Sequence, residues 1–577
     1  MGNLNHQFEA KDIGLRTPEV VMDLKRLGSF YPYKLSFMRK LIRKLMTEKW
    51  DISLTLFNLD KDGFGEAVYE IKTPLNNFHF VVFANFLDPE LRSDRVIAEA
   101  WDMTVTLRHG VFNPKDLIFL KENVPLQEKG RMTSNSVVLS RANKSSRNFD
   151  YVINELSSGK QPCIKKINEV GYLYRTTAVY GSGKFGMADW DKVKTSYADF
   201  SEPFSAEMFS CFLIRQFSLD QADHIAHQRN PKTAVKLNKS IKRYIGIGNA
   251  TGLGMAPFLI KHPLLINNWI ETRERVLAKV LNDTSPDKNK LASFLLLVSR
   301  AIIHLNQITT NNLTQKEINI NVSDDLSLIA NYVTEHQDKI KKWQQVTQYV
   351  AENFSIEAQE LINTVLIEIY PKEALLFEKN QEIEEIYDLV PEMKLSKLKT
   401  IIQNQYQWAL KYNFKSENAD AIFWYRSEEK MEPRLGERNI DKGADKEMLI
   451  GIARSIEQCY STIQNLSPEL KINNVAEFIF AHPEYRQIIR RIQTMSKTTY
   501  GEIQANLNDK DVLPIHLLRC KLSFFGVGKF DPKSRLWVRN TMFQGAPIIS
   551  DISNEYKDEW FFPVMPNIES SKGNEIH

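Results

Sequence analysis

The sequence predicts an α+β protein, and three observations lead to this fold class. Near the N-terminus, apolar and polar residues alternate, which predicts an antiparallel sheet. All 24 glycines lie outside residues 255–435, and this stretch carries helical periodicity instead. A further β-rich stretch follows at 516–543. We therefore expect an N-terminal antiparallel sheet with a winged-helix-like hairpin unit, a large central all-α block and a second small β element near the C-terminus.

The length of 577 residues predicts several domains rather than one. We expect an antiparallel sheet domain with a basic amphipathic helix at 1–130. A winged-helix-like unit with glycine-rich loops follows at 131–254, a helical domain at 255–435 and a mixed α/β domain at 436–577. A composition of 43% hydrophobic and 25% charged residues is typical of folded globular chains.

The N-terminal domain begins with a basic amphipathic helix. Residues 34–48 place apolar side chains on one helical face and lysines and arginines around the rest. Such a helix can contact nucleic acid or a membrane surface, but we expect a core-facing helix with a solvated basic back. Alternating residues then predict strands at 52–56, 65–72 and 78–85, and 96–110 adds a fourth.

The winged-helix-like unit is predicted by the order of its elements. A helix at 147–156 and a short helix at 163–170 precede two strands around a glycine-rich turn. In the helical block, apolar periodicity from Leu291 to Leu305 and at 327–351, 356–370 and 394–413 predicts successive helices.

Charge and cysteine usage narrow the function classes. Lys and Arg number 75 against 71 Asp and Glu, so the chain lacks the net positive field of a dedicated nucleic-acid-binding protein. The four cysteines form no C-x-x-C pair, which indicates neither a disulfide framework nor a thiolate zinc site. No apolar stretch is long enough to span a bilayer. We expect a soluble cytoplasmic protein without a membrane partner.

The first candidate site is the glycine-rich turn at 177–186. Compared with the phosphate-binding motif G-x-x-x-x-G-K-[ST], Ala178 replaces the first glycine and Phe185 replaces the magnesium-binding hydroxyl, so a nucleoside triphosphatase is excluded. Tyr180 is a candidate proton donor, because the neighbouring Lys184 lowers the pKa of a phenol. Packing in a strand is the alternative for this tyrosine.

The same turn is a candidate anion site. Gly181 and Gly183 let backbone N–H groups approach a ligand, and Lys184 supplies a charge suited to carboxylate or phosphate. Arg175 and Thr177 project from one face of the incoming strand. The alternative is an ordinary hairpin turn with a solvated Lys184.

The second candidate site is the stretch 239–258, which contains four glycines, at 246, 248, 252 and 254; its candidate binding residues are Gly248, Asn249 and Thr251. A glycine-rich loop that leads into a helix makes an anion site, and the spacing also matches a dinucleotide-binding variant. No second strand or ribose-binding acid follows at the expected distance, which argues against the dinucleotide. Glycines that permit close packing are the structural alternative.

An echo links the two halves of the chain. Residues 181–185 read G-S-G-K-F and 526–530 read G-V-G-K-F, so Lys529 is a candidate binding residue from the second half. The G-x-G-K-F motif precedes a second repeated motif, F-x-x-x-H-P, in the first half and follows it in the second half. A simple duplication is therefore not supported, and a chance resemblance is the alternative. His224 and His227 have a spacing that can share a metal, but no metal-binding framework surrounds them, so we assign no metal site.

These features favour an enzyme that acts on a small anionic metabolite bearing a carboxylate or a phosphate. Its reaction type, cofactor and oligomeric state stay open. The alternative is a winged-helix-type nucleic-acid-binding or regulatory protein, in which the G-x-G-K-F tips contact phosphates. A helical scaffold for partner proteins is a third class, but it leaves the glycine clusters unexplained.

Overall fold

The computed structural model describes residues 14–88, 90, 100–126, 133–176, 193, 195–202, 204–252, 263–381, 387–415, 424–426, 433–435, 449–500, 502, 514–533, 537–552 and 560–567. The chain forms two compact units, each built from three separate stretches. Unit 1 comprises Met1–Leu35, Ala256–Val298 and Asp325–Lys521; unit 2 comprises Ser36–Met255, Ser299–Asp324 and Leu522–His577. Unit 2 contains a large sheet and unit 1 is dominated by helices, which confirms the α+β fold class.

Unit 2 contains a nine-stranded sheet in the order β1-β2-β3-β4-β5-β6-β7-β11-β10. Its strands are β1 Asp51–Leu59, β2 Gly65–Lys72, β3 Asn77–Ala84, β4 Met103–His109, β5 Ser136–Lys144, β6 Tyr172–Thr176, β7 Gly246–Gly252, β10 Lys529–Pro532 and β11 Trp537–Met542. The predicted strands at 65–72 and 78–85 are confirmed as β2 and β3, and β4 confirms the fourth strand in a shorter form.

All pairs of neighbouring strands are antiparallel except β6 and β7, which are parallel. The connection between these two strands contains α8 Ser205–Arg229 and α9 Lys239–Tyr244. The expected C-terminal β element is present as the β10–β11 hairpin, but it joins β7 and so completes the N-terminal sheet. The first part of the predicted β-rich stretch is instead helix α22, Pro514–Phe525.

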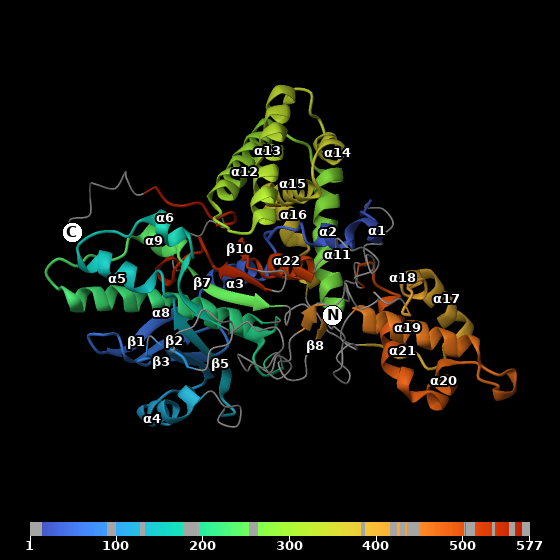
Figure 1. Ribbon diagram of the computed structural model, residues 1–577, viewed down its shortest axis with the longest axis horizontal. Helices are drawn as coiled ribbons and strands as arrows, with labels where there is room; N and C mark the ends of the chain where they lie inside the picture. The colour runs from blue at the N-terminus through green and yellow to red at the C-terminus, as the bar shows by residue number, and fades with distance from the viewer. Residues whose placement is uncertain are drawn as a thin grey trace. The chain divides into compact units, whose positions relative to one another are not determined.

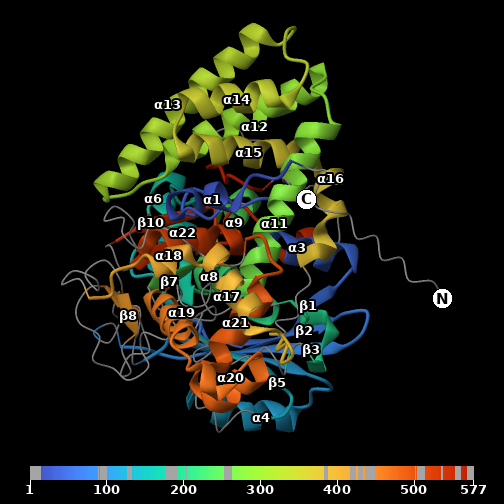
Figure 2. The same ribbon diagram turned by 90° about the vertical axis from the view of Figure 1, so that its right-hand side faces the viewer.

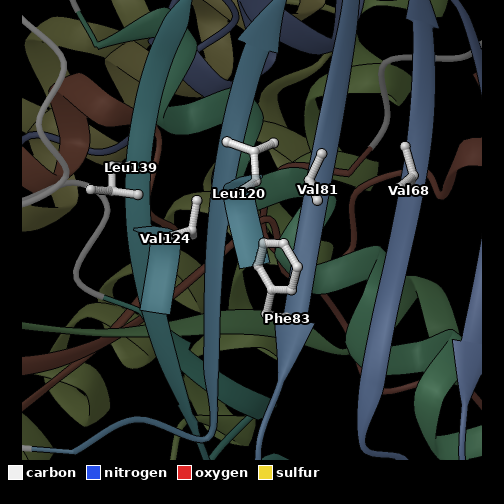
Figure 3. Packing of buried hydrophobic residues seen from close by; sticks show 6 residues of the cluster. All are labelled: Val68, Val81, Phe83, Leu120, Val124 and Leu139. Atoms are coloured by element: carbon white, nitrogen blue, oxygen red, sulfur yellow. The ribbon is translucent and has the colours of Figure 1, made fainter. Parts of the chain in front are cut away.

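Helices cover both faces of the sheet (Figures 1 and 2). On one face, Tyr69 of β2 donates a hydrogen bond to Asp220 of α8 at 2.8 Å. On the other face lies α4, Pro114–Asn123. Figure 3 shows how α4 and the turn after it pack on this face, where the buried side chains are Val68, Val81, Phe83, Leu120, Val124 and Leu139.

The basic amphipathic helix is confirmed as α3, Phe37–Thr47, but its basic back is not fully solvated. Arg39 and Lys40 are 1% and 7% exposed. Lys40 forms an ion pair with Glu202 at 2.7 Å, and the Arg39 guanidinium lies 5.2 Å from the ring centre of Phe561. The expectation of a solvated back was wrong for these two residues, because other parts of unit 2 bind the cations.

The winged-helix-like order of helix, helix and strand is present as α5 Phe149–Ser157, α6 Ile164–Asn168 and β6. Strand β6 pairs with β5 on one side and with β7 on the other, so residues 172–176 belong to the large sheet. The expected second strand of the hairpin falls on 177–192, outside the described residues.

Unit 1 confirms the predicted helical block. Its helices include α1 Pro18–Val21, α2 Leu24–Leu27, α11 Pro263–Asp283, α14 Trp343–Asn353, α15 Ile356–Ile369, α16 Pro371–Leu376, α17 Leu395–Gln405, α18 Gln407–Leu410, α19 Leu449–Gln464, α20 Val475–Ala481 and α21 Arg486–Met495. Helices α12 Lys288–Gln307, α13 Leu313–His336 and α22 belong partly to each unit. The predicted helix at 327–351 is two helices, α13 and α14. A short antiparallel pair, β8 Trp424–Arg426 and β9 Pro433–Leu435, also lies in unit 1.

A buried ion network holds the first described residues of unit 1 to its helices. Glu360 of α15 accepts from Arg16 at 2.6 Å, from Arg26 at 2.6 Å and from Arg273 at 2.8 Å. Glu274 accepts from Arg16 at 2.7 Å and from Arg273 at 3.0 Å. Burial opposes ionisation of Glu360, but Arg16 and Arg273 outweigh it and hold the pKa of this carboxyl well below its usual range.

Candidate functional site

The parallel strands β6 and β7 bring the two predicted glycine-rich segments to one edge of the sheet. Strand β6 ends at Thr176, directly before the 177–192 segment, and β7 ends at Gly252, directly before 253–262. Because neighbouring parallel strands end at the same edge, both segments begin there. In open α/β sheets, ligand sites lie outside the carboxyl ends of parallel strands, and among the described strands β6 and β7 are the one parallel pair of this otherwise antiparallel sheet.

Five of the predicted site residues lie outside the described part of the chain: Thr177, Tyr180, Gly181, Gly183 and Lys184. Strand β6, which directly precedes them, is described. Gly248, Asn249 and Thr251 lie in β7, so residues 246–252 form a strand where a loop was expected.

The glycines of β7 permit close packing. A Cβ atom on Gly248 would lie 2.5 Å from the ring of Tyr172, and one on Gly246 would lie 2.4 Å from the carbonyl oxygen of Met542. Both distances are shorter than real Cβ contacts, so any larger residue forces neighbouring atoms to move. Within the described residues, the packing role that was the structural alternative therefore accounts for these two glycines.

Three of the predicted residues share one row across the sheet. Arg175 of β6 pairs with Gly248 of β7, Gly248 pairs with Thr541 of β11, and Thr541 pairs with Lys529 of β10. Residues that pair directly across strands project from the same face. Arg175 and Lys529, 354 positions apart in the sequence, therefore lie on one face of one sheet.

Asn249 projects from the opposite face, because successive residues of a strand alternate. It pairs with Asn540 of β11, and the two side chains are 2% and 1% exposed. Asn249 is thus a buried residue between neighbouring strands and does not share the face of Arg175.

The face of Arg175 carries two further arginines that the sequence reasoning missed, Arg141 of β5 and Arg539 of β11. Arg539 pairs with Ala250, two positions beyond Gly248, and Arg141 lies two positions before Asn143, the partner of Arg175. Both arginines therefore lie on the face of Arg175, towards the carboxyl ends of β6 and β7. Strand spacing and rise put the three Cα atoms roughly 8 to 15 Å apart. We call Arg141, Arg175 and Arg539 the arginine face.

The side chains of the arginine face are all partly exposed. The Arg141 guanidinium stacks over Trp101, 3.8 Å from the ring centre, which fixes the plane of its donors. Burial lowers the pKa of Arg141 to about 10, so it stays cationic at neutral pH. Alternation in S-V-V-L-S-R-A-N-K indicates which side Arg141 faces, but only the strand order shows that this side is shared with Arg175.

Lys529 is a buried amine that contacts neutral oxygen atoms. It is 5% exposed, and its Nζ donates to the backbone carbonyl of Asn168 and to Asn168 Oδ1, the latter at 2.8 Å. Tyr244 donates to the same Oδ1 at 2.7 Å. Burial lowers the pKa of Lys529 to about 8. These contacts hold Lys529 against the turn before β6.

Close to this turn, the side chain of Gln544 is buried at 4% exposure. Neither its amide nitrogen nor its amide oxygen has a hydrogen-bond partner among the described residues. Its Nε2 lies 3.3 Å from the position of a Cβ on Gly171. A buried amide of this kind requires a polar partner such as water or a ligand.

The histidine pair does not form a metal site within the described residues, where no cluster of histidine, cysteine or acidic side chains can hold an ion. His224 Nε2 lies 2.9 Å from the carbonyl oxygen of Asp60, and its ring packs edge-on against Phe57. Nor is any helix of the described chain long and apolar enough to cross a membrane.

Comparisons of the chain with protein-family models, with curated proteins and with solved structures found no match in any of the three. The functional argument therefore depends on the site itself.

Proposed function

We propose that this protein is a cytoplasmic enzyme that acts on a small anionic metabolite, and that the metabolite's carboxylate or phosphate binds at the arginine face. The observation that carries the proposal is the location of Arg141, Arg175 and Arg539 on one face, at the carboxyl ends of the parallel strands β6 and β7. Arginine donors in this arrangement suit planar, bidentate binding of carboxylate or phosphate oxygens.

The electrostatics of unit 2 support an anionic ligand. Arg215 of α8 donates to five backbone carbonyls around the start of β7, among them Ile245 at 2.6 Å and Pro547 at 2.8 Å. Lys529 is a second buried cation of unit 2; it lies on the face of Arg175, whereas Arg215 belongs to α8, on the opposite face of the sheet. Carbonyl dipoles satisfy the donors of these groups without cancelling their net charge.

The chemistry would come from the segment that directly follows Arg175. In this proposal Lys184 binds the anion together with the arginines, and Tyr180 donates a proton to the reacting group. Both residues lie within ten positions of Arg175 in the sequence, and β6 ends at Thr176, at the edge towards which Arg141 and Arg539 lie.

A nucleic-acid-binding protein is the less favoured alternative. The formal net charge of the whole chain is only +4. Strand β6 is paired along both edges, so residues 172–176 are not a two-stranded wing free to enter a groove.

Isothermal titration of the full chain tests the binding step. The probes are inorganic phosphate, a phosphomonoester and a dicarboxylate, each compared with its uncharged analogue. We expect at least one anion to bind, and Arg175→Gln to weaken its affinity roughly tenfold to a hundredfold, as for loss of a charge-assisted hydrogen bond. Proton and phosphorus NMR of the incubated mixture then reports turnover.

Arg229→Gln is the matched control, because Arg229 is an exposed arginine of unit 2 whose Nη1 donates only to the side chain of Asn154 among the described residues. It should bind as wild type does. If wild type and Arg175→Gln show the same affinity for every anion, the assignment of the site fails. Binding without turnover of any probe would support a binding protein and contradict the enzyme.

A further inference from the structure

The outer side of α4 exposes apolar residues. Val111, Ile118, Phe119 and Leu126 are 84%, 63%, 45% and 50% exposed. The inner side of the same segment is well packed, since Leu120 and Val124 are 3% and 4% exposed in the cluster with β2–β5 (Figure 3). The segment thus uses one side for its own core and presents a second apolar side to solvent.

The exposed residues form one stripe. Within α4, the positions 115, 118, 119 and 122 follow one another at steps of three, one and three, which is the spacing of a single helical face; Val111 lies before the helix and Leu126 in the 3-10 turn after it. Lys115 and Glu122, both exposed, occupy this face between the apolar residues. We call these six residues the α4 stripe.

The α4 stripe is complementary to itself when it is read in the opposite direction. About a midpoint between Ile118 and Phe119 of α4, Lys115 is equivalent to Glu122. An antiparallel pair of α4 helices related by a two-fold axis therefore places Ile118 beside Phe119 of the other copy and each Lys115 beside a Glu122. In a two-fold interface, residue i contacts j and j contacts i, which the four helical positions of the stripe satisfy.

We propose that the α4 stripe is a docking surface for a second copy of this chain, and that the two α4 helices pair antiparallel. The charge pattern selects a second copy as the occupant, because in an antiparallel pair the lysine of each helix meets the glutamate of the other. A partner of uniform charge would meet one like charge. The flanking Asp116 and Lys121 contact Arg108 and Glu66 of their own chain, so Lys115 and Glu122 carry the charge pairing.

One helix pair buries less area than a standard stable interface, so the dimer is weak and depends on concentration. This proposal is independent of the anion site. The α4 segment packs over β2–β5, whereas the arginine face comes from β5, β6 and β11.

Sedimentation velocity of the full chain over a range from about 1 to several hundred micromolar tests the proposal. We expect the weight-average sedimentation coefficient of wild type to rise with concentration towards that of a dimer. Ile118→Asp should sediment as a monomer throughout this range. Far-UV circular dichroism and an unchanged midpoint of thermal unfolding show that the exposed substitution leaves the fold intact.

A charge swap tests the antiparallel register. Lys115→Glu puts two glutamates together at each end of the helix pair, and Glu122→Lys puts two lysines together. Each single variant should weaken dimerisation about tenfold, because the two-fold axis doubles each exposed pair. The double variant restores opposite charges and should recover most of the wild-type affinity.

The charge pairing should also weaken in high salt. A wild-type chain that stays monomeric at the highest concentration overturns the proposal. So does a dimer that Ile118→Asp leaves intact, since the copies then meet through another surface. A double charge variant that is weaker than both single variants overturns the antiparallel register.

Discussion

Arg273 and Arg491 of unit 1 contact carboxylates, whereas Arg215 and Lys529 of unit 2 contact carbonyl oxygens. In unit 1, Arg273 pairs with Glu274 and Glu360, and Arg491 pairs with Glu502 at 2.7 Å. In unit 2, Arg215 donates to backbone carbonyls, and Lys529 donates to the two oxygens of Asn168.

The pKa values respond in opposite directions. Burial opposes the charge of Arg491, but Glu502 outweighs it and raises the pKa of this arginine. Burial lowers the pKa of Arg215 to about 9 and that of Lys529 to about 8. A carboxylate cancels the charge of its partner, and a carbonyl only satisfies the donors. Carboxylates therefore neutralise Arg273 and Arg491. Arg215 and Lys529 instead donate to carbonyl oxygens, and Asp551 and Asp531 act on them only through charge.

Glu360→Gln is expected to have the largest effect. It removes the carboxylate that Arg16, Arg26 and Arg273 share and leaves buried guanidinium groups without that counter-charge. Breaking a buried ion pair on one side costs about 3–5 kcal/mol of unfolding free energy. Urea unfolding, followed by the fluorescence of Trp269 and Trp343 in unit 1, measures the loss.

Asp388→Asn is the matched control in the same unit. Asp388 and Lys497 also pair at 2.7 Å, but their side chains are 49% and 61% exposed. An exposed pair contributes at most about 1 kcal/mol. Equal losses for the two variants would contradict the carboxylate neutralisation inferred for unit 1.

The second prediction concerns pH and Lys529. Its pKa is about 8 in the folded chain, against an ordinary value of 10.5, so between these pH values the unfolded chain binds more protons. The free energy of unfolding of wild type, relative to Lys529→Met, should therefore rise by about 3 kcal/mol as the pH increases from 8 to 10.5. Chemical unfolding of both proteins at a series of pH values gives this difference.

A flat difference between wild type and Lys529→Met over this pH range would indicate that Lys529 is solvated or neutralised by an acid. The contrast between the units would then fail at this residue.

Local patterns in the sequence predicted much of the fold. The alternation at 65–72 predicts β2 with its observed bounds, and the periodicity of 34–48 predicts α3, because each pattern records which side of a single element is buried. The β10–β11 hairpin was predicted as a separate element, since no local pattern records that β11 pairs with β7, about 290 positions earlier.

The candidate site was predictable only in part, for the same reason. The alternation around Arg175 indicates its face, and the repeated G-x-G-K-F motif pointed to Lys529, which lies in the same row of the sheet. Arg141 and Arg539 have equally clear alternation in their own strands, but they become neighbours of Arg175 only through the strand order. The glycines of β7 were expected to form a loop, because glycine spacing alone does not distinguish a turn from a tightly packed strand.

Gly248→Ala tests the packing of β7, the strand that lies between β6 with Arg175 and β11 with Arg539, and has the smallest expected effect. A Cβ at this position meets the Tyr172 ring at 2.5 Å, so the substitution should cost about 1–3 kcal/mol, as for overpacking of a core. Gly528→Ala is the matched glycine control, because its Cβ lies 3.4 Å from Pro563, an ordinary contact, and it should stay within about 0.5 kcal/mol of wild type. Thermal unfolding ranks the two variants. If Gly248→Ala is as stable as wild type but loses anion binding, Gly248 serves the ligand rather than the packing of Tyr172.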